Sequence, residues 1–167
     1  YTGYKENNGP FVIRYPRGKG EMADWRNEMH VLPIGKGKKL RDGDDIAILS
    51  LGPIGNEVIK AIKEIEGDGI SIAHYDMIYL KPMDEELLHE VGKKFSRIIT
   101  VENGVIRGGL GSAVLEFMAD NGYTPKIKRI GVPDEFVEHG PISELYKLCG
   151  MDAKCIAEEI KKMVIGG

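Results

Sequence analysis

This 167-residue sequence has only two cysteines, no long apolar run and no excess of basic charge, and each of these features argues against a class of protein. Cys149 and Cys155 are six positions apart, which is not a spacing that zinc ligands use. We expect two free thiols, as in most cytosolic proteins. No apolar run approaches the ~20 residues of a membrane span. No signal-peptide pattern is present either, so we expect a cytoplasmic location and no membrane partner.

The composition is otherwise that of an ordinary soluble domain. Hydrophobic residues make up 42% of the chain, charged residues 29%, and the net charge is -3. Because nucleic-acid-binding domains are usually basic, we expect no nucleic-acid partner. The length allows one domain and a piece of a second.

Strand-like and helix-like patterns alternate from Asp45 to the C-terminus, which predicts an α/β fold with a mostly parallel sheet covered by helices on both faces, in three α/β/α layers. The expected strands are 45–51, 70–75, 97–101 and 127–132, and the expected helices are 54–65, 84–95, 112–120, 142–149 and 153–164. Asp84 and Asp152 are the expected N-caps of two of these helices. Val114, Leu115 and Met118 are expected on the buried face of the third helix.

A further strand is expected at 38–41, joined to the strand 45–51 by an Asp42-Gly43 hairpin turn. It would add one antiparallel edge strand to the sheet. Before it, residues 11–15 form a short strand candidate that Pro16 ends. Residues 19–35 have no clean periodicity and indicate a linker.

Three carboxylates follow the ends of expected parallel strands: Asp76, Glu102 and Asp134. Ligands of open α/β sheets collect at this edge, so the three could converge on a divalent cation or a phosphoryl group. The favoured interpretation is that they cap helices and hold loops.

The stretch 97–117 contains Gly108, Gly109 and Gly111 between an expected strand and Ser112, where an expected helix begins. It matches the dinucleotide-binding turn poorly, because Val114 occupies the third glycine position. Close packing of the helix on the sheet is favoured over a nucleotide site.

The four histidines are scattered in the sequence, and three of them have no pattern that indicates chemistry. His139 differs because it lies next to Gly140 in an expected irregular loop, where functional residues are more frequent.

Arg14 and Arg17 bracket a rigid Tyr-Pro pair near the N-terminus. An arginine guanidinium binds a phosphate dianion through two parallel donors, so these residues are candidates for a phosphate site. A solvated pair at a strand end is the alternative that their spacing alone leaves open.

A series of motifs, in order, resembles the C-terminal part of the 1-deoxy-D-xylulose-5-phosphate synthase family, which belongs to the transketolase-like thiamine diphosphate enzymes. The motifs are GPFVIRYPRG (9–18), LPIGKG (32–37), KPMD (81–84), TVE (100–102) with GGLGS (108–112), and GVPD (131–134) with HG (139–140). The first two are fairly specific to this family, and KPMD and GGLGS are shared more widely. The resemblance covers essentially the whole chain.

The resemblance implies a parent enzyme that condenses pyruvate with glyceraldehyde 3-phosphate and releases carbon dioxide, with thiamine diphosphate and Mg²⁺ as cofactors. It implies that residues 1–20 end the middle, pyrimidine-binding domain, that 21–35 are a linker and that 36–167 are a transketolase C-terminal-like domain. Arg17 resembles the family's substrate-phosphate ligand, and Arg14 a supporting residue. The glutamate that activates the cofactor and the metal motif have no counterpart here, so we expect no cofactor on this chain.

We therefore expect a fragment, inactive alone, whose partners are its own N-terminal and middle domains and a second subunit of a homodimer. One alternative is the C-terminal domain of a transketolase or of a 2-oxo-acid dehydrogenase β-subunit. Another is a stand-alone α/β ligand-binding module. In the family two acidic residues often follow the TV strand, whereas here Glu102 is followed by Asn103.

Overall fold

The computed structural model describes residues 1–6, 9–13 and 26–166. The chain forms two compact units, Tyr1–Ile34 and Gly35–Gly167. In the first unit, α1 (Thr2–Lys5) is a single turn of helix, and the Thr2 hydroxyl accepts a hydrogen bond of 2.9 Å from the Leu32 backbone N–H. The strand predicted at 11–15 is wrong for its described part, because residues 11–13 pair with no other strand. An extended segment without a ladder partner has nothing to hold it as a strand.

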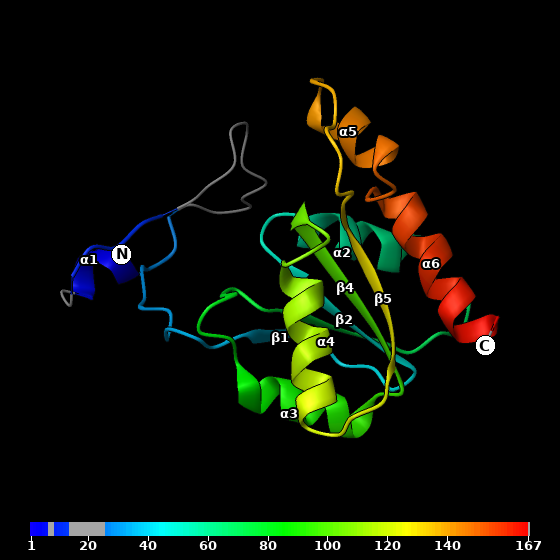
Figure 1. Cartoon of the computed structure of the whole chain (residues 1–167), viewed down its shortest axis with the longest axis horizontal. Helices are drawn as coiled ribbons and strands as arrows, with labels where there is room; N and C mark the ends of the chain where they lie inside the picture. The colour runs from blue at the N-terminus through cyan, green and yellow to red at the C-terminus, as the bar shows by residue number, and fades with distance from the viewer. Residues whose placement is uncertain (7–8, 14–25, 167) are drawn as a thin grey trace. The chain divides into compact units, whose positions relative to one another are not determined.

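The second unit is built on a five-stranded sheet (Figure 1). The strand order is β1 (Lys38–Arg41), β3 (Ile72–Asp76), β2 (Ile46–Leu51), β4 (Arg97–Val105) and β5 (Lys126–Val132). The neighbours β3, β2, β4 and β5 are parallel, whereas β1 pairs antiparallel with β3. This confirms the predicted mostly parallel sheet with one antiparallel edge strand.

Five helices accompany this sheet in the described part of the unit. They are α2 (Gly55–Glu64), α3 (Glu85–Lys94), α4 (Leu110–Asp120), α5 (Ile142–Leu148) and α6 (Ala153–Ile165). Within the described residues, no helix has both the length and the apolar character needed to cross a lipid bilayer.

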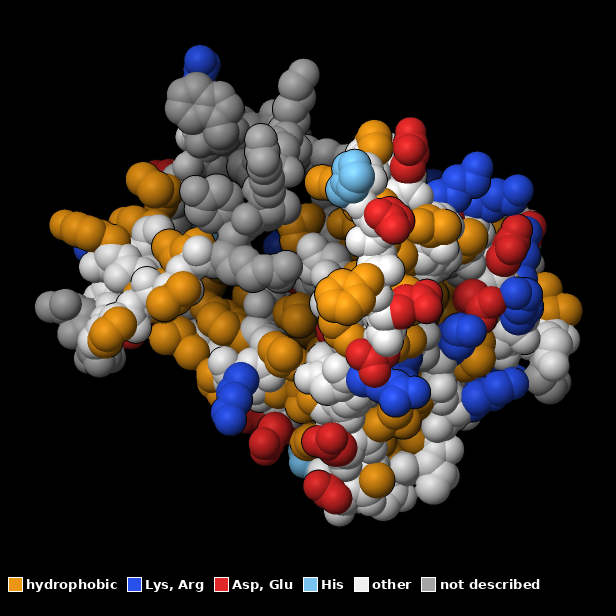
Figure 2. All heavy atoms as spheres, turned by 45° about the horizontal axis from the view of Figure 1, so that its top comes forward, with side chains coloured by type: hydrophobic (Ala, Val, Ile, Leu, Met, Phe, Trp, Pro, Cys, Tyr) orange, Lys and Arg blue, Asp and Glu red, His pale blue; other side chains and the backbone are white. Residues whose placement is uncertain are grey.

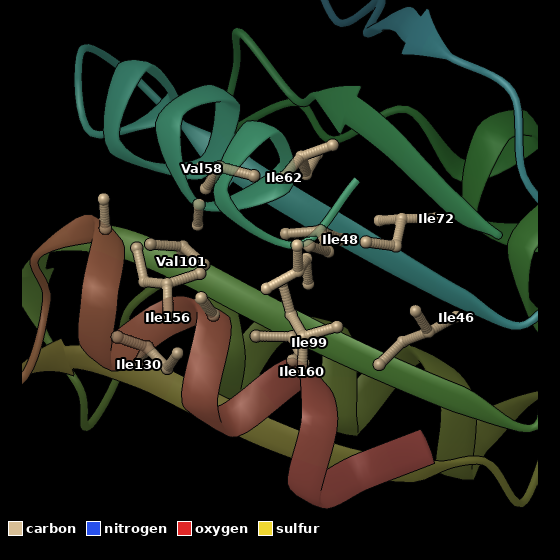
Figure 3. Packing of buried hydrophobic residues seen from close by; sticks show 14 of the residues in the cluster. Ile46, Ile48, Val58, Ile62, Ile72, Ile99, Val101, Ile130, Ile156 and Ile160 are labelled. Carbon is tan, nitrogen blue, oxygen red and sulfur yellow. The ribbon is translucent and has the colours of Figure 1, made fainter. Parts of the chain in front are cut away.

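The sheet separates two hydrophobic cores, because successive side chains of a strand point to opposite faces. On one face, Ile48 and Ile99 pack with Val58 of α2 and Ile156 of α6 (Figure 3). On the other face lie the side chains of a second cluster, contributed by β2, β3, β4, α3 and α4: Ala47, Leu49, Ala73, Tyr75, Leu88, Val91, Ile98, Leu110, Val114 and Met118. The two cores confirm the three-layer α/β/α arrangement predicted from the alternation of strands and helices.

The predicted Asp42-Gly43 hairpin is wrong, because β1 and β2 are not neighbours: β3 lies between them. A Cβ at Gly43 would overlap the backbone where Ile72 meets Ala73, so the chain crosses close to the start of β3 here. β2 is buried on both faces and pairs with a parallel strand on each side. The central position of this apolar strand leaves no free edge for β1.

The boundary between β4 and α4 also differs from the prediction. β4 continues to Val105 rather than ending at Val101, and α4 begins at Leu110 rather than at Ser112. Leu115 is 39% exposed, whereas Val114 and Met118 are buried. Residues four apart share a face of a helix, but Leu115 lies about 100° around the axis from Val114.

Asp84 is the N-cap of α3, as predicted. One of its carboxylate oxygens accepts a hydrogen bond from the Leu87 N–H at 3.2 Å, and the other accepts one from the Gly37 N–H at 2.9 Å. Lys36 Nζ lies 3.5 Å from the same carboxylate. Burial alone would raise the pKa of Asp84, but the two N–H donors and the Lys36 charge outweigh it and hold the pKa below its ordinary value.

Asp84→Asn is expected to destabilise the chain at neutral pH by about 1 kcal/mol, because the amide keeps only one acceptor oxygen and loses the charge. The folded pKa of Asp84 lies below the ordinary value of 3.8. Its stabilisation is therefore complete well above that pH and is lost as the pH falls through 3.8 to the folded pKa.

Urea unfolding of both proteins between about pH 7 and about pH 3 measures this difference. The difference in unfolding free energy must shrink toward acid pH. Asp120→Asn, at the exposed end of α4, is the matched control and should leave the pH dependence unchanged. A difference for Asp84→Asn that is constant with pH contradicts the assignment.

Candidate functional site

The candidate site lies at the carboxyl ends of the four parallel strands. β2, β3, β4 and β5 run in one direction, so the segments that follow them meet at one end of the sheet (Figure 1). In open α/β sheets this end is where ligands bind. Asp76, Glu102 and Asp134 all lie at this end or just beyond it, as the sequence predicted.

The carboxylate of Glu102 is buried and occupies the N-terminus of α4. Its two oxygens accept hydrogen bonds from the backbone N–H groups of Leu110, at 2.8 Å, and Gly111, at 2.9 Å. The N-cap residue, Gly109, has no side chain that could do this. Glu102 thus caps the helix from the adjoining strand, and its charge faces the positive end of the helix dipole.

Three glycines surround this carboxylate. A Cβ at Gly109 would overlap the Glu102 carboxylate, and a Cβ at Gly104 would lie 3.1 Å from one of its oxygens. A Cβ at Gly131, on β5, would lie 3.2 Å from Glu102 Cγ. The glycine-rich corner therefore makes room for a carboxylate of the protein itself, which supports the packing interpretation over a nucleotide site.

The three carboxylates do not form one metal site. β2 separates the strands of Asp76 and Glu102, so two inter-strand spacings, roughly 10 Å, lie between these strands. Asp76 accepts a hydrogen bond from the Ile78 N–H at 3.1 Å, and Asp134 lies 3.7 Å from Arg107 Nε. No group of three His, Cys, Asp or Glu residues in the described ranges could hold a metal ion. The loop-fixing interpretation therefore applies.

The Asp76 side chain is partly buried at this edge of the sheet. Burial is the largest cause and raises the pKa of Asp76, and the hydrogen bond from the Ile78 N–H opposes it. The Asp76 side chain binds the backbone two residues further along the chain, which holds the turn after β3.

Three of the four histidines lie in the second unit and occupy different environments. His74 is buried, its Nε2 lies 2.9 Å from the Ser50 hydroxyl, and burial lowers its pKa to about 4. His89 Nδ1 lies 3.0 Å from the Tyr123 hydroxyl, between α3 and the end of α4. His139 is exposed in the loop after β5. His74 and His89 are thus packing residues, as expected.

Arg14 and Arg17, the predicted phosphate ligands, lie outside the described residues. Their role stays a prediction from the sequence.

Sequence reasoning missed an open groove of about 780 Å³ beside β5 and α6. Its charges are largely paired: Glu159 accepts from Lys128 at 3.0 Å and from Lys162 at 2.8 Å. Cys149 and Cys155 also line it. The Asp152 carboxylate beside the thiol, together with burial, raises the pKa of Cys155 to about 11. Both cysteines are free, as predicted, and a protonated thiol is a weak nucleophile.

The glycine corner at the start of α4 does not fit thiamine diphosphate, and no group of three His, Cys, Asp or Glu residues in the described part of the chain could hold Mg²⁺. A diphosphate needs unoccupied N–H donors, and those of α4 are bonded to Glu102. The hydroxyl of Thr100 is buried beside them without a hydrogen-bond partner, but a Cβ at Gly111 would already lie 2.8 Å from it and 2.7 Å from Arg129 Cδ. The space is filled by protein, so no step of chemistry can be assigned to either cofactor here.

Comparison with known proteins identifies the class. Residues 35–156 match the family model for the transketolase C-terminal domain, so the chain belongs to that family. A solved chain titled as an inactive β4 tetramer of a split-gene transketolase is 32% identical with a TM-score of 0.73, covering 81% of this chain and 43% of that one. Transketolase from Campylobacter jejuni, at 15% identity and a TM-score of 0.55, covers 75% of this chain and 18% of that chain and shows the fold alone.

The sequence relatives are more specific than the family model, because those described here share one enzyme name. The 1-deoxy-D-xylulose-5-phosphate synthase of Parabacteroides distasonis is 78% identical over 162 residues, which are 97% of this chain and 26% of that protein. The enzymes of the same name from Bacteroides fragilis and Syntrophotalea carbinolica are 58% and 41% identical, over 97% and 95% of this chain and 25% of each relative. The chain thus spans about a quarter of the length of these relatives. The resemblance predicted from the motifs is confirmed.

Gly109→Val is expected to lower the free energy of unfolding by roughly 3 kcal/mol, because the new side chain displaces Glu102 and leaves a buried charge and helix N–H groups unpaired. Urea unfolding of this chain measures the loss. Gly67→Val is the matched control, since a Cβ at Gly67 meets no atom within 4 Å. Equal losses for the two variants would show that Glu102 does not need the space.

Proposed function

We propose that this chain is the C-terminal part of a 1-deoxy-D-xylulose-5-phosphate synthase. The observation that carries the proposal is the 78% identity to such an enzyme over 97% of the chain, at about a quarter of that enzyme's length. The whole enzyme would condense pyruvate with glyceraldehyde 3-phosphate, release carbon dioxide and form deoxyxylulose phosphate for the synthesis of isoprenoids, thiamine and pyridoxal. It would be a cytoplasmic homodimer.

The proposed division of the chain is that residues 1–20 end the middle domain, 21–35 are a linker and 36–167 are the C-terminal domain. The family match from residue 35 onward and the separation of the two compact units between Ile34 and Gly35 support it. Thiamine diphosphate and Mg²⁺ would be held by the N-terminal and middle domains. The part played by 36–167 is then to pack against these domains and to support the dimer.

The N-terminal piece would carry the substrate contact. Arg17 would bind the phosphate of glyceraldehyde 3-phosphate, and Arg14 would support it. A guanidinium presents two parallel N–H donors to a phosphate, a geometry that lysine does not offer. This assignment comes from the YPRG motif at 15–18.

The other candidate functions receive less support. The C-terminal domain of a transketolase or of a 2-oxo-acid dehydrogenase β-subunit would have the same fold, but the relatives described above carry the name of the synthase at 41% to 78% identity. A stand-alone ligand-binding module would need an open site at the carboxyl end of the sheet. In the described residues, Glu102 fills the glycine corner that was the candidate for it.

The isolated chain is expected to be inactive with pyruvate, glyceraldehyde 3-phosphate, thiamine diphosphate and Mg²⁺. In its described residues no group of three His, Cys, Asp or Glu side chains could hold the metal, and Glu102 occupies the N–H donors of α4. A coupled assay of deoxyxylulose phosphate, run beside the full-length enzyme from the same gene, measures this. Turnover by the isolated chain at the full-length rate would refute the proposal. So would a gene that encodes no further domain.

Arg17→Ala in the full-length enzyme is expected to raise KM for glyceraldehyde 3-phosphate more than tenfold and to leave KM for pyruvate unchanged. Loss of a charged phosphate contact costs roughly 2–4 kcal/mol. Arg17→Lys is the matched control, because it keeps the charge without the paired donors. Its KM for glyceraldehyde 3-phosphate should lie between the values of the unmodified enzyme and of Arg17→Ala. An unchanged KM for glyceraldehyde 3-phosphate in Arg17→Ala would rule out the phosphate contact.

A further inference from the structure

Residues 133–148, which we call the arm, leave the sheet after β5 and carry apolar side chains that no described residue covers. The arm contains the loop after β5 and all of α5, which has no buried residue (Figure 1). Phe136 is 107% exposed, Leu148 70% and Ile142 50%. An aromatic side chain in full contact with water gains nothing for the fold of this unit.

The arm is held at its base. The Tyr146 side chain packs against the core cluster of α2 and α6. Asp134, at the start of the arm, pairs with Arg107 at 3.7 Å. The base thus has a defined position on the sheet, whereas the side chains toward Phe136 have none of these supports. A segment that is fixed at its base and exposes apolar side chains is typical of a protein–protein interaction site.

Other exposed apolar side chains gather at the same end of the unit. Leu80, between β3 and α3, is 38% exposed, and Val105, at the end of β4, is 45% exposed. Leu80 follows the carboxyl end of a parallel strand, as the arm does, and Val105 is the last residue of another. Figure 2 turns the top of Figure 1 forward and shows apolar side chains interspersed with acidic ones on that face.

The charges of the arm restrict its partner. It contains four carboxylates and a single lysine: Asp134, Glu135, Glu138, Glu144 and Lys147. Two copies of the arm facing each other would place like charges together, which costs affinity. An apolar surface with a basic rim is complementary to the arm.

We propose that the arm docks on an apolar surface with a basic rim that belongs to the polypeptide preceding this chain in the full-length enzyme. The inference rests on the proposed function. The relatives are about four times as long as this chain, so most of their surface lies outside it. Phe136 is the central contact of this interface.

The test is the accessibility of a cysteine in the arm of the full-length enzyme. The variant Phe136→Cys is treated with a maleimide. The matched control is Ile165→Cys, at the C-terminal end of α6. Mass mapping of peptides distinguishes labelling of the introduced cysteine from labelling of Cys149 and Cys155. Ile165 is 71% exposed and lies outside the arm. The expected result is labelling at position 136 at least tenfold slower than at 165 in the full-length enzyme, and equal rates at the two positions in this chain alone.

Equal rates in the full-length enzyme would overturn the proposal. Slow labelling of position 136 in this chain alone, increasing in strength with protein concentration, would identify a second copy as the partner and would also overturn it. Leu148→Cys repeats the measurement where Phe136→Cys does not yield folded enzyme. A gene that encodes no preceding domains would instead refute the proposed function, so the two failures are distinct.

Discussion

The hydrogen bonds between the Glu102 carboxylate and the first N–H groups of α4 are the interaction on which the second unit depends. A single buried side chain joins the central strand β4 to the helix that covers it. The cost of burying a carboxylate is offset only while both oxygens have donors, so the glycines around it must stay small. The geometry of the whole corner follows from this requirement.

The packing around this interaction explains why the sheet has its order. β2 and β4 occupy the centre because their side chains are buried on both faces, and each fully buried isoleucine or leucine contributes roughly 1.5–3 kcal/mol. β1 has no buried residue and contains three basic residues, which suits an edge that must not pair with another chain. The helices then divide between the two faces.

The same geometry separates architecture from chemistry in this chain. The carboxyl end of the sheet has the glycines and carboxylates that mark a ligand site in other α/β proteins, yet in the described residues they bind the backbone or an arginine of the chain itself. The assignments that involve substrate concern the short N-terminal piece. The arm, with its exposed Phe136 side chain, is the part of this unit that we propose for contact with a partner.

Most elements of the second unit could be predicted from local pattern, since the spacing of Ile54, Val58 and Ile62 and the caps Asp84 and Asp152 act within a few residues. The family, too, follows from motifs that need no coordinates. Tertiary structure alone decided that β3 separates β1 from β2, and which of the three carboxylates caps a helix and which two hold loops. These outcomes depend on which segments, far apart in the sequence, pair with the same central strand or bind the same helix end. Local periodicity does not predict such long-range contacts.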